Sequence, residues 1–312
     1  MRRTFRIISC VILFTAGFPA FTQSTQLRYA IIPENPRPGE PVTIGVSGGE
    51  TAGLKSAALS SGGRLLSRTS FFAIPEEGGK RPFMAAILTV PSTAKPGTAV
   101  INLESAGGLV SAIPLHIAER EFISEVIELN ENLTVIRTLP DPQKTAESEQ
   151  LWAILSSMGN EIYCLGSFSP PVTSTRRTSF FGDRRMFKYS DGGSDTSIHA
   201  GVDYGVPTGT PVRACGSGKV VLARFRIVTG NSVVIEHLPG MYSLYYHLDN
   251  IAIKEGDIVS AGTLLGQSGV TGLATGPHLH WEIRVSGENT DPDAFIARPI
   301  LDKDTILSKI ND

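Results

Sequence analysis

The sequence predicts an all-β protein with an N-terminal β-sandwich, a partly helical connector and a second, antiparallel β domain. Short apolar or alternating runs separated by glycine and proline occupy most of the chain, and one internal segment, 145–159, shows helical periodicity. The 312 residues are 41% hydrophobic and 19% charged, enough for two globular domains. With a formal charge of -2 and no cluster of Lys and Arg interleaved with aromatic residues, the sequence gives no sign of nucleic-acid binding.

Residues 1–26 are expected to be a secretory signal peptide. A basic stretch at 1–6 precedes an apolar run at 7–18, and cleavage is expected between Ala20 and Gln26. The mature protein would then be exported, periplasmic or associated with the cell envelope, and would keep no stable membrane span. An uncleaved anchor is disfavoured because a span needs about 20 apolar residues, and lipidation of Cys10 is disfavoured because almost no apolar run precedes it.

The segment 27–118 is expected to form the β-sandwich. Its apolar and alternating runs have the length of strands and are separated by turn residues, with an early turn at 36–41. This pattern resembles that of immunoglobulin-like domains. The predicted strands are 27–32, 41–46, 54–59, 83–90, 98–103 and 109–117.

The connector is expected to span 119–165 and to contain a helix over 145–159. The helix would start with a capping box at Thr145, in which Ser148 replaces the usual Glu, and end at Gly159. Trp152 and Leu155 are expected to be packing residues. A second short helix is expected in the tail, 301–312.

The second domain, 166–312, is rich in Val, Ile and Leu, with turns at Gly, Asn and Pro, which favours antiparallel strands. His278 and His280 begin an alternating run, and residues two apart on a strand share a face about 6 to 7 Å apart. His199 and Asp203 would lie about 13 Å apart in an extended chain. Binding of one ion by both therefore requires a bend, which Gly201 permits. Imidazoles and a carboxylate suit Zn²⁺, and three protein ligands leave a position for water.

The stretch from 178 to 295 resembles the M23 family of zinc endopeptidases, the lysostaphin and LytM type, which cut peptidoglycan cross-bridges and stem peptides. Many short motifs carry the resemblance in order along the chain. They are Ser179 to Arg185, His199 to Gly205, Gly209 to Val212, Gly218 to Val221, Gly230 to His237, Tyr245 to Leu248, Gly256 to Val259, Gly266 to Gly272, Thr275 to Glu282 and Asp291-Pro292.

The resemblance implies that His199, Asp203 and His280 bind Zn²⁺ and that His278 and His247 are the catalytic pair. His278 is assigned as general base and His247 as the stabilising or orienting group, with the opposite assignment open. No position of this set is substituted here. The resemblance also implies a groove with zinc at its floor, which would accept an extended, glycine- or alanine-rich peptide.

Four further residues have chemistry that the metal site does not need. His237 is expected in a groove wall or a turn, and His116 is expected to be structural. Cys164 and Cys215 could form a disulfide, worth about 4 kcal/mol for a loop of about 50 residues, or remain two buried thiols. Both alternatives stay open.

Two functions fit the sequence. The favoured one is an exported zinc-dependent endopeptidase that hydrolyses peptide cross-links or stem peptides of peptidoglycan by metal-activated water. The alternative is a catalytically quiet peptidoglycan-binding or hydrolase-activating module, and the intact ligand set argues against it. The resemblance also suggests autoinhibition by the sandwich or the connector, in which case a regulatory protein partner or proteolysis would free the cleft.

Overall fold

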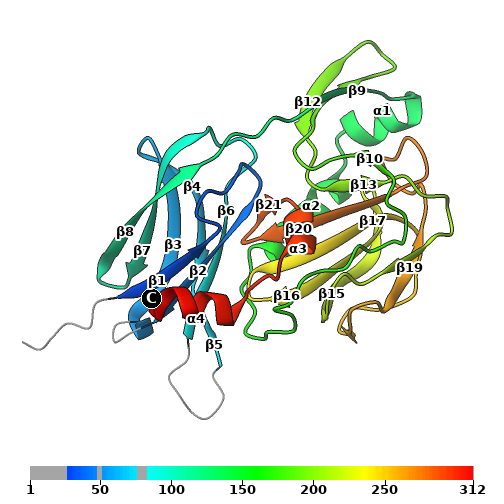
Figure 1. Cartoon of the computed structure of the whole chain (residues 1–312). Coiled ribbons are helices and arrows are strands. Elements are labelled where there is room, and N and C mark those ends of the chain that lie inside the picture. Colours follow the sequence, from blue (N-terminus) through cyan, green and yellow to red (C-terminus); the bar gives the residue numbers. More distant parts are fainter. Residues whose placement is uncertain (1–26, 48–50, 76–82, 312) are drawn as a thin grey trace, which may run out of the picture.

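Two antiparallel sheets lie face to face in the N-terminal part of the protein (Figure 1). They belong to a computed structural model that describes residues 27–47, 51–75 and 83–311. Apolar side chains from both sheets, including Ile44, Leu59 and Ile101, form the core between them. The predicted β-sandwich is therefore confirmed, whereas the expected signal peptide at 1–26 lies outside the described residues.

The sandwich contains two strands that the sequence analysis missed, β4 and β5. The inward positions of β4 are polar: Ser67 is buried and its hydroxyl donates to the Thr89 carbonyl at 2.6 Å. A hydrophobic pattern therefore does not mark β4. One sheet has the order β1 (Arg28–Ile32), β2 (Pro41–Ser47), β6 (Phe83–Thr89), β5 (Phe72–Ile74), and the other β4 (Arg64–Ser70), β3 (Leu54–Ser61), β7 (Gly97–Ser105), β8 (Gly108–Ile117); a short 3-10 turn, Thr51–Gly53, precedes β3.

The connector carries two helices, α1 (Glu131–Thr138) and α2 (Pro142–Leu155). The predicted start at Thr145 is wrong, because the Asp141 side chain caps α2 by accepting from the Gln143 amide, and Pro142 occupies the first helical turn. Leu155 is buried as expected. Trp152 is 59% exposed, with only the far edge of its ring over Gly287, so its assignment as a packing residue is largely wrong.

The connector also contributes a strand that the sequence analysis did not predict. This strand, β9 (Ser124–Glu128), pairs in parallel with β11 (Arg184–Lys188), which pairs antiparallel with β12 (Ser194–Ile198). Leu133 of α1 packs against Phe187 on one face of this small sheet. Figure 1 shows β9, β12 and α1 together at one end of the molecule, beyond the large sheet.

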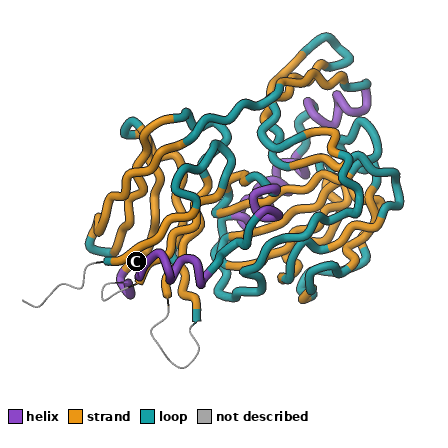
Figure 2. The backbone as a smooth tube through the Cα atoms, in the orientation of Figure 1, coloured by secondary structure: helices purple, strands orange, loops and turns teal. Residues whose placement is uncertain are grey.

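A large antiparallel sheet forms most of the second part, as predicted, and helices are few and short throughout (Figure 2). The main path of the sheet is β10, β13, β20, β17, β16, β15, β18, while β14 and β19 pair with each other and β21 pairs with β20. The bounds are β10 (Arg177–Ser179), β13 (Val202–Tyr204), β14 (Pro211–Arg213), β15 (Gly218–Arg226), β16 (Gly230–Leu238), β17 (Met241–Ile251), β18 (Ile258–Val259), β19 (Leu264–Ser268), β20 (Leu279–Val285) and β21 (Glu288–Thr290).

A single apolar core joins the sandwich to the large sheet. It runs from Phe83 on the outer face of the first sheet to Trp281 of β20 and to Ile306 of the C-terminal helix. This helix, α4 (Lys303–Asn311), follows the short helix α3 (Asp293–Ala297) and lies beside β1 and β2 (Figure 1). The tail helix is thus confirmed. No helix among the described residues is both long and apolar enough to cross a membrane.

His237 and Cys215 lie inside the second part rather than on a groove wall. His237 is fully buried; its Nδ1 donates to the Ser217 carbonyl at 2.7 Å and its Nε2 lies 2.7 Å from the Ser243 hydroxyl. The placement of His237 in a groove wall or turn is therefore wrong, because this histidine is a satisfied core residue. Cys164 and Cys215 are free thiols in this structure. His116 is an exposed residue of β8.

The docking of α4 should contribute measurably to stability. Ile306 is fully buried, and a Cβ on Gly45 of β2 would lie only 2.1 Å from its Cγ2 atom. Ile306→Ala should lower the free energy of unfolding by about 2 to 5 kcal/mol, because it leaves a cavity between α4 and the sandwich. Ile258→Ala, at a position 65% exposed, should change it by less than about 0.5 kcal/mol. Urea denaturation measures both values, and equal losses would contradict this account.

Candidate metal centre

Asp203 and His280 face each other across two neighbouring strands of the large sheet. In the antiparallel β13–β20 pair, Asp203 is the Cα partner of His280. Side chains of directly opposed residues lie on the same face and within reach of each other. His280 Nδ1 lies 2.7 Å from Asp203 Oδ1, and both side chains are almost fully buried.

His199 reaches the same point from the loop between β12 and β13. The chain bends there as expected. The glycine at 201 was predicted to permit this bend, but the structure gives a different reason for it: a Cβ at this position would lie 2.2 Å from the Trp281 carbonyl oxygen. The glycine is therefore needed for close packing against β20. The His199 Nδ1 donates to the Phe180 carbonyl at 2.8 Å, which points Nε2 towards the cluster.

Three donor atoms therefore converge, one from each residue. His199 Nε2 lies 3.0 Å from His280 Nδ1 and 3.2 Å from Asp203 Oδ1, which completes a small triangle. Around a tetrahedral zinc ion, ligand atoms at about 2.0 to 2.1 Å from the metal lie about 3.3 Å from one another. An ion would need to lengthen the three edges of the triangle by about 0.1 to 0.6 Å, so the three residues fit a metal of this kind.

A second layer of polar groups holds His280 in place. Its Nε2 donates to Glu282 Oε1 at 2.9 Å, and Arg284 binds the other carboxylate oxygen at 2.8 Å. Although burial acts in the opposite direction, Arg284 and His280 lower the pKa of Glu282 to about 2. Burial also opposes the protonated form of His280, yet Asp203 and Glu282 raise the pKa of His280 to about 9.

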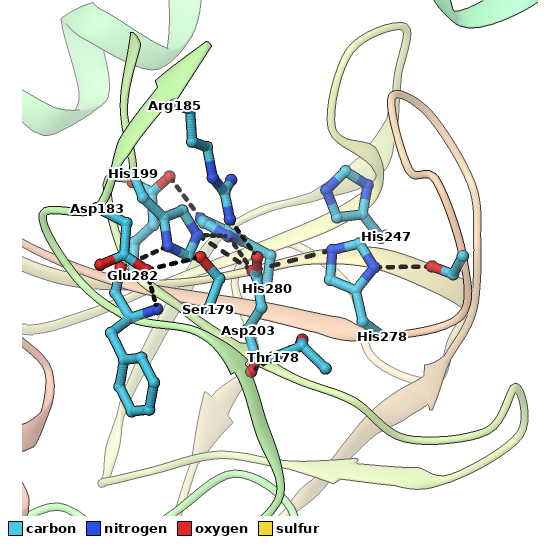
Figure 3. A network of polar contacts seen from close by, with 12 residues as sticks. Thr178, Ser179, Asp183, Arg185, His199, Asp203, His247, His278, His280 and Glu282 are labelled. Carbon is cyan, nitrogen blue, oxygen red and sulfur yellow. Dashed lines mark hydrogen bonds and ion pairs between the residues drawn. The ribbon is translucent and has the colours of Figure 1, made fainter. Parts of the chain in front are cut away.

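His278 and His247 stand together beside this cluster (Figure 3). Their ring centroids are 4.7 Å apart, and His278 Nε2 lies 3.9 Å from Asp203 Oδ1. Each Nδ1 bonds at 2.8 Å to a carbonyl, that of Gly276 for His278 and that of Thr271 for His247. The Nε2 atom of each ring takes no part in these two bonds. Burial lowers the pKa of both imidazoles, that of His247 to about 3.

The backbone of His247 is strained. Its φ of 62° is a left-handed value that costs a residue other than glycine about 1 kcal/mol or more. The position falls where the pairing of β16 with β17 is irregular, and the His247 amide donates to the Thr229 carbonyl at 2.9 Å. This bulge turns the imidazole towards His278.

A cavity of about 290 Å³ opens over these five side chains. Its walls come from the large sheet and from the connector, which contributes Ile127, Leu129 and Arg137. None of the described sandwich residues lines this cavity. The expectation that the sandwich covers the metal therefore finds no contact to support it, whereas the connector does border the site.

Sequence reasoning assigned no role to two charged residues that touch the ligands. Arg185 donates to Asp203 Oδ2 at 2.7 Å (Figure 3), and Glu282 holds His280. Both residues lie in motifs that carry the resemblance to the M23 family. The two-residue spacing from His280 could have placed Glu282 on the same strand face. The position of Arg185 depends on long-range pairing of β11 and carries no local signal.

Comparisons with known proteins agree with this geometry. Residues 197–292, which include all five site residues, match the model of peptidase family M23. The chain is 33% identical over 172 residues to peptidoglycan DD-endopeptidase ShyA of Vibrio cholerae, which is 55% of this chain and 39% of that protein. It is 41% identical over 110 residues to lysostaphin of Staphylococcus staphylolyticus, covering 33% of this chain and 23% of lysostaphin.

A solved structure described as an M23 peptidase from Pseudomonas aeruginosa shares the fold, with a TM-score of 0.58 and 24% identity over 84% of this chain and 94% of the other. The matched segments span only 31%, 39% and 22% of the length of three curated relatives. Together the family match and the relatives show that residues 197–292 are similar to peptidase family M23.

Proposed function

We propose that this protein is an exported, zinc-dependent endopeptidase that hydrolyses peptide cross-links or stem peptides of peptidoglycan. The observation that carries the proposal is the convergence of His199, Asp203 and His280 within 2.7 to 3.2 Å of one another, beside two further histidines. Relatives named as peptidoglycan endopeptidases support the substrate class.

His199, Asp203 and His280 would hold the zinc ion. A borderline metal suits two imidazoles and one carboxylate, and three protein ligands leave an open position. When bound, zinc would supply Lewis acidity at the scissile carbonyl and make water a better nucleophile. The Nδ1–carbonyl bond of His199 and the Nε2–Glu282 bond of His280 fix which nitrogen of each ring is free to bind.

His278 and His247 would act on the attacking water, His278 by proton transfer and His247 by orienting it. Burial keeps both imidazoles neutral at neutral pH, so Nε2 of His278 can accept a proton from the attacking water and return it to the leaving amine. Since Nδ1 of His247 donates to the Thr271 carbonyl at 2.8 Å, its unprotonated Nε2 is left to accept a hydrogen bond and can orient the attacking water.

The proposed organisation is a signal peptide at 1–26, an immunoglobulin-like domain at 27–118, a connector at 119–165 and the peptidase domain at 166–312. The strand order supports the assignment of 27–118 as an immunoglobulin-like domain. Read along the chain as A, B, C, C′, D, E, F and G, the eight strands give sheets A-B-E-D and C′-C-F-G, the arrangement of immunoglobulin sandwiches.

Digestion of purified sacculi tests the activity. Incubation with the protein should release peptides of cleaved cross-links or stems, which mass spectrometry identifies. A strong chelator should abolish the release and added Zn²⁺ should restore it. Binding to sacculi without release at any zinc concentration would instead support the quiet binding or activating module.

Two classes of substitution separate metal binding from catalysis. His280→Ala and Asp203→Ala should lose zinc and activity together, because each removes one of three protein ligands. His247→Ala should keep near-stoichiometric zinc and lose about 100-fold or more in kcat, because its contribution is made in the transition state. Elemental analysis checks the metal content. Zinc lost from His247→Ala but kept in His280→Ala would reverse the assignment.

Zinc affinity should fall as the pH falls. Because the carboxylates of Asp203 and Glu282 raise the pKa of His280 to about 9, the metal-free cluster holds a proton at neutral pH that zinc must displace. Below about pH 9 the affinity should therefore drop about tenfold for each pH unit. Calorimetry in two buffers of different ionisation enthalpy should detect about one proton released per zinc at pH 7. Affinity that does not change between about pH 6 and 8 would contradict this proton count.

A further inference from the structure

We infer that Arg185, held by Glu125 of the connector, is a positioning residue for the metal ligand Asp203. Arg185 Nη2 donates to Asp203 Oδ2 at 2.7 Å, and Arg185 Nε donates to Glu125 Oε1 at 2.5 Å. The inference rests on the proposed function, since it concerns how the same site binds its metal.

Geometry fixes which oxygen of Asp203 faces the cluster. Oδ1 is the atom within 2.7 Å of His280 and 3.2 Å of His199, whereas Oδ2 is turned away and occupied by the guanidinium. A planar guanidinium on Oδ2 prevents the carboxylate from rotating and leaves Oδ1 as the single donor to the ion. The side chains of Asp203 and Arg185 are 9% and 15% exposed, so water competes little for these bonds.

Glu125 compensates the positive charge that Arg185 brings to the metal site. A guanidinium next to a metal ligand repels a divalent cation and draws the carboxylate charge away from it. Glu125 supplies the compensating charge, so the Arg185–Glu125 pair adds no net charge near the site. Its carboxylate also lies 2.9 Å from the Ser179 hydroxyl, which fixes its orientation.

The backbone explains how a connector residue reaches the metal site. In the parallel pairing of β9 with β11, Glu125 is the Cα partner of Arg185. Alternate residues of a strand face opposite sides, so Glu125 and Arg185 face the cluster while their neighbours, such as Val126 and Met186, are exposed on the other face. The connector therefore contributes Glu125 to the support of the metal centre.

Zinc affinity of the full chain, measured by competition with a chromophoric chelator, tests the inference without using activity. Arg185→Gln should weaken zinc binding by about 10- to 100-fold, as expected for groups that orient metal ligands. Glu125→Gln should weaken it by about tenfold. In the double variant, Glu125→Gln should change the zinc affinity of Arg185→Gln by less than about twofold, because Glu125 acts through Arg185. Glu128→Gln and Lys188→Gln alter a matched pair on the opposite face of β9 and β11 and should leave the affinity unchanged.

Several results would overturn the inference. If charge repulsion alone governed the site, Arg185→Gln would bind zinc as tightly as the native protein or more tightly. Independent, additive effects of Glu125→Gln and Arg185→Gln would remove the link to the connector. Losses of zinc affinity of the same size in Glu128→Gln would indicate a general destabilisation of the fold, which circular dichroism and thermal unfolding of the metal-free variants would also reveal. A native protein that binds no zinc would overturn the proposed function and this inference together, whereas equal affinities would overturn the inference alone.

Discussion

The register between β13 and β20 is the constraint on which the site depends. It places Asp203 opposite His280, while the pairing of β17 with β20 places Tyr246 opposite His280 from the other side, with its ring stacked on the imidazole at 5.6 Å. Because strand side chains alternate between faces, a slip of one residue in β20 would move His280 to the opposite face of the sheet. Trp281, fully buried on that other face, opposes such a slip by anchoring the shared core.

The two ligands at this register are supported in the same way. His280 is held by a carboxylate that an arginine neutralises, Glu282 with Arg284, and Asp203 is held by an arginine that a carboxylate neutralises, Arg185 with Glu125. Each ligand is thus oriented by a charged partner, and each outer pair is neutral. Because the outer pairs are neutral, the net charge at the site comes from Asp203 and the bound ion. A single carboxylate favours a cation at this point without a large excess of negative charge.

The sequence allowed prediction of the fold class, of six of the eight strands in the described part of the sandwich, and of the five residues that the structure brings together at one cavity. Those features have local signals, because alternation marks a half-buried strand and the histidine motifs mark the site. β9 gave no such signal: its five residues, Ser124 to Glu128, do not alternate between polar and apolar types, and the segment is a strand through its pairing with β11, some 60 residues away. The cap of helix α2 was misplaced by four residues because Thr145 resembles a cap, whereas Asp141, followed by Pro142, is the actual one. Its Thr145 hydroxyl instead lies 3.4 Å from the Asp141 carbonyl oxygen.

The position of α4 has a consequence for how the chain becomes folded. The outer face of β1 and β2 is covered by Ile306 and Ile310, from a helix that ends at residue 311. During synthesis this apolar face emerges about 260 residues before its cover, so it stays exposed to water until the residues of α4 have been made. Contacts of such long sequence separation form late and slowly. The sandwich therefore acquires the cover of its outer face only after all the strands of the large sheet have been made.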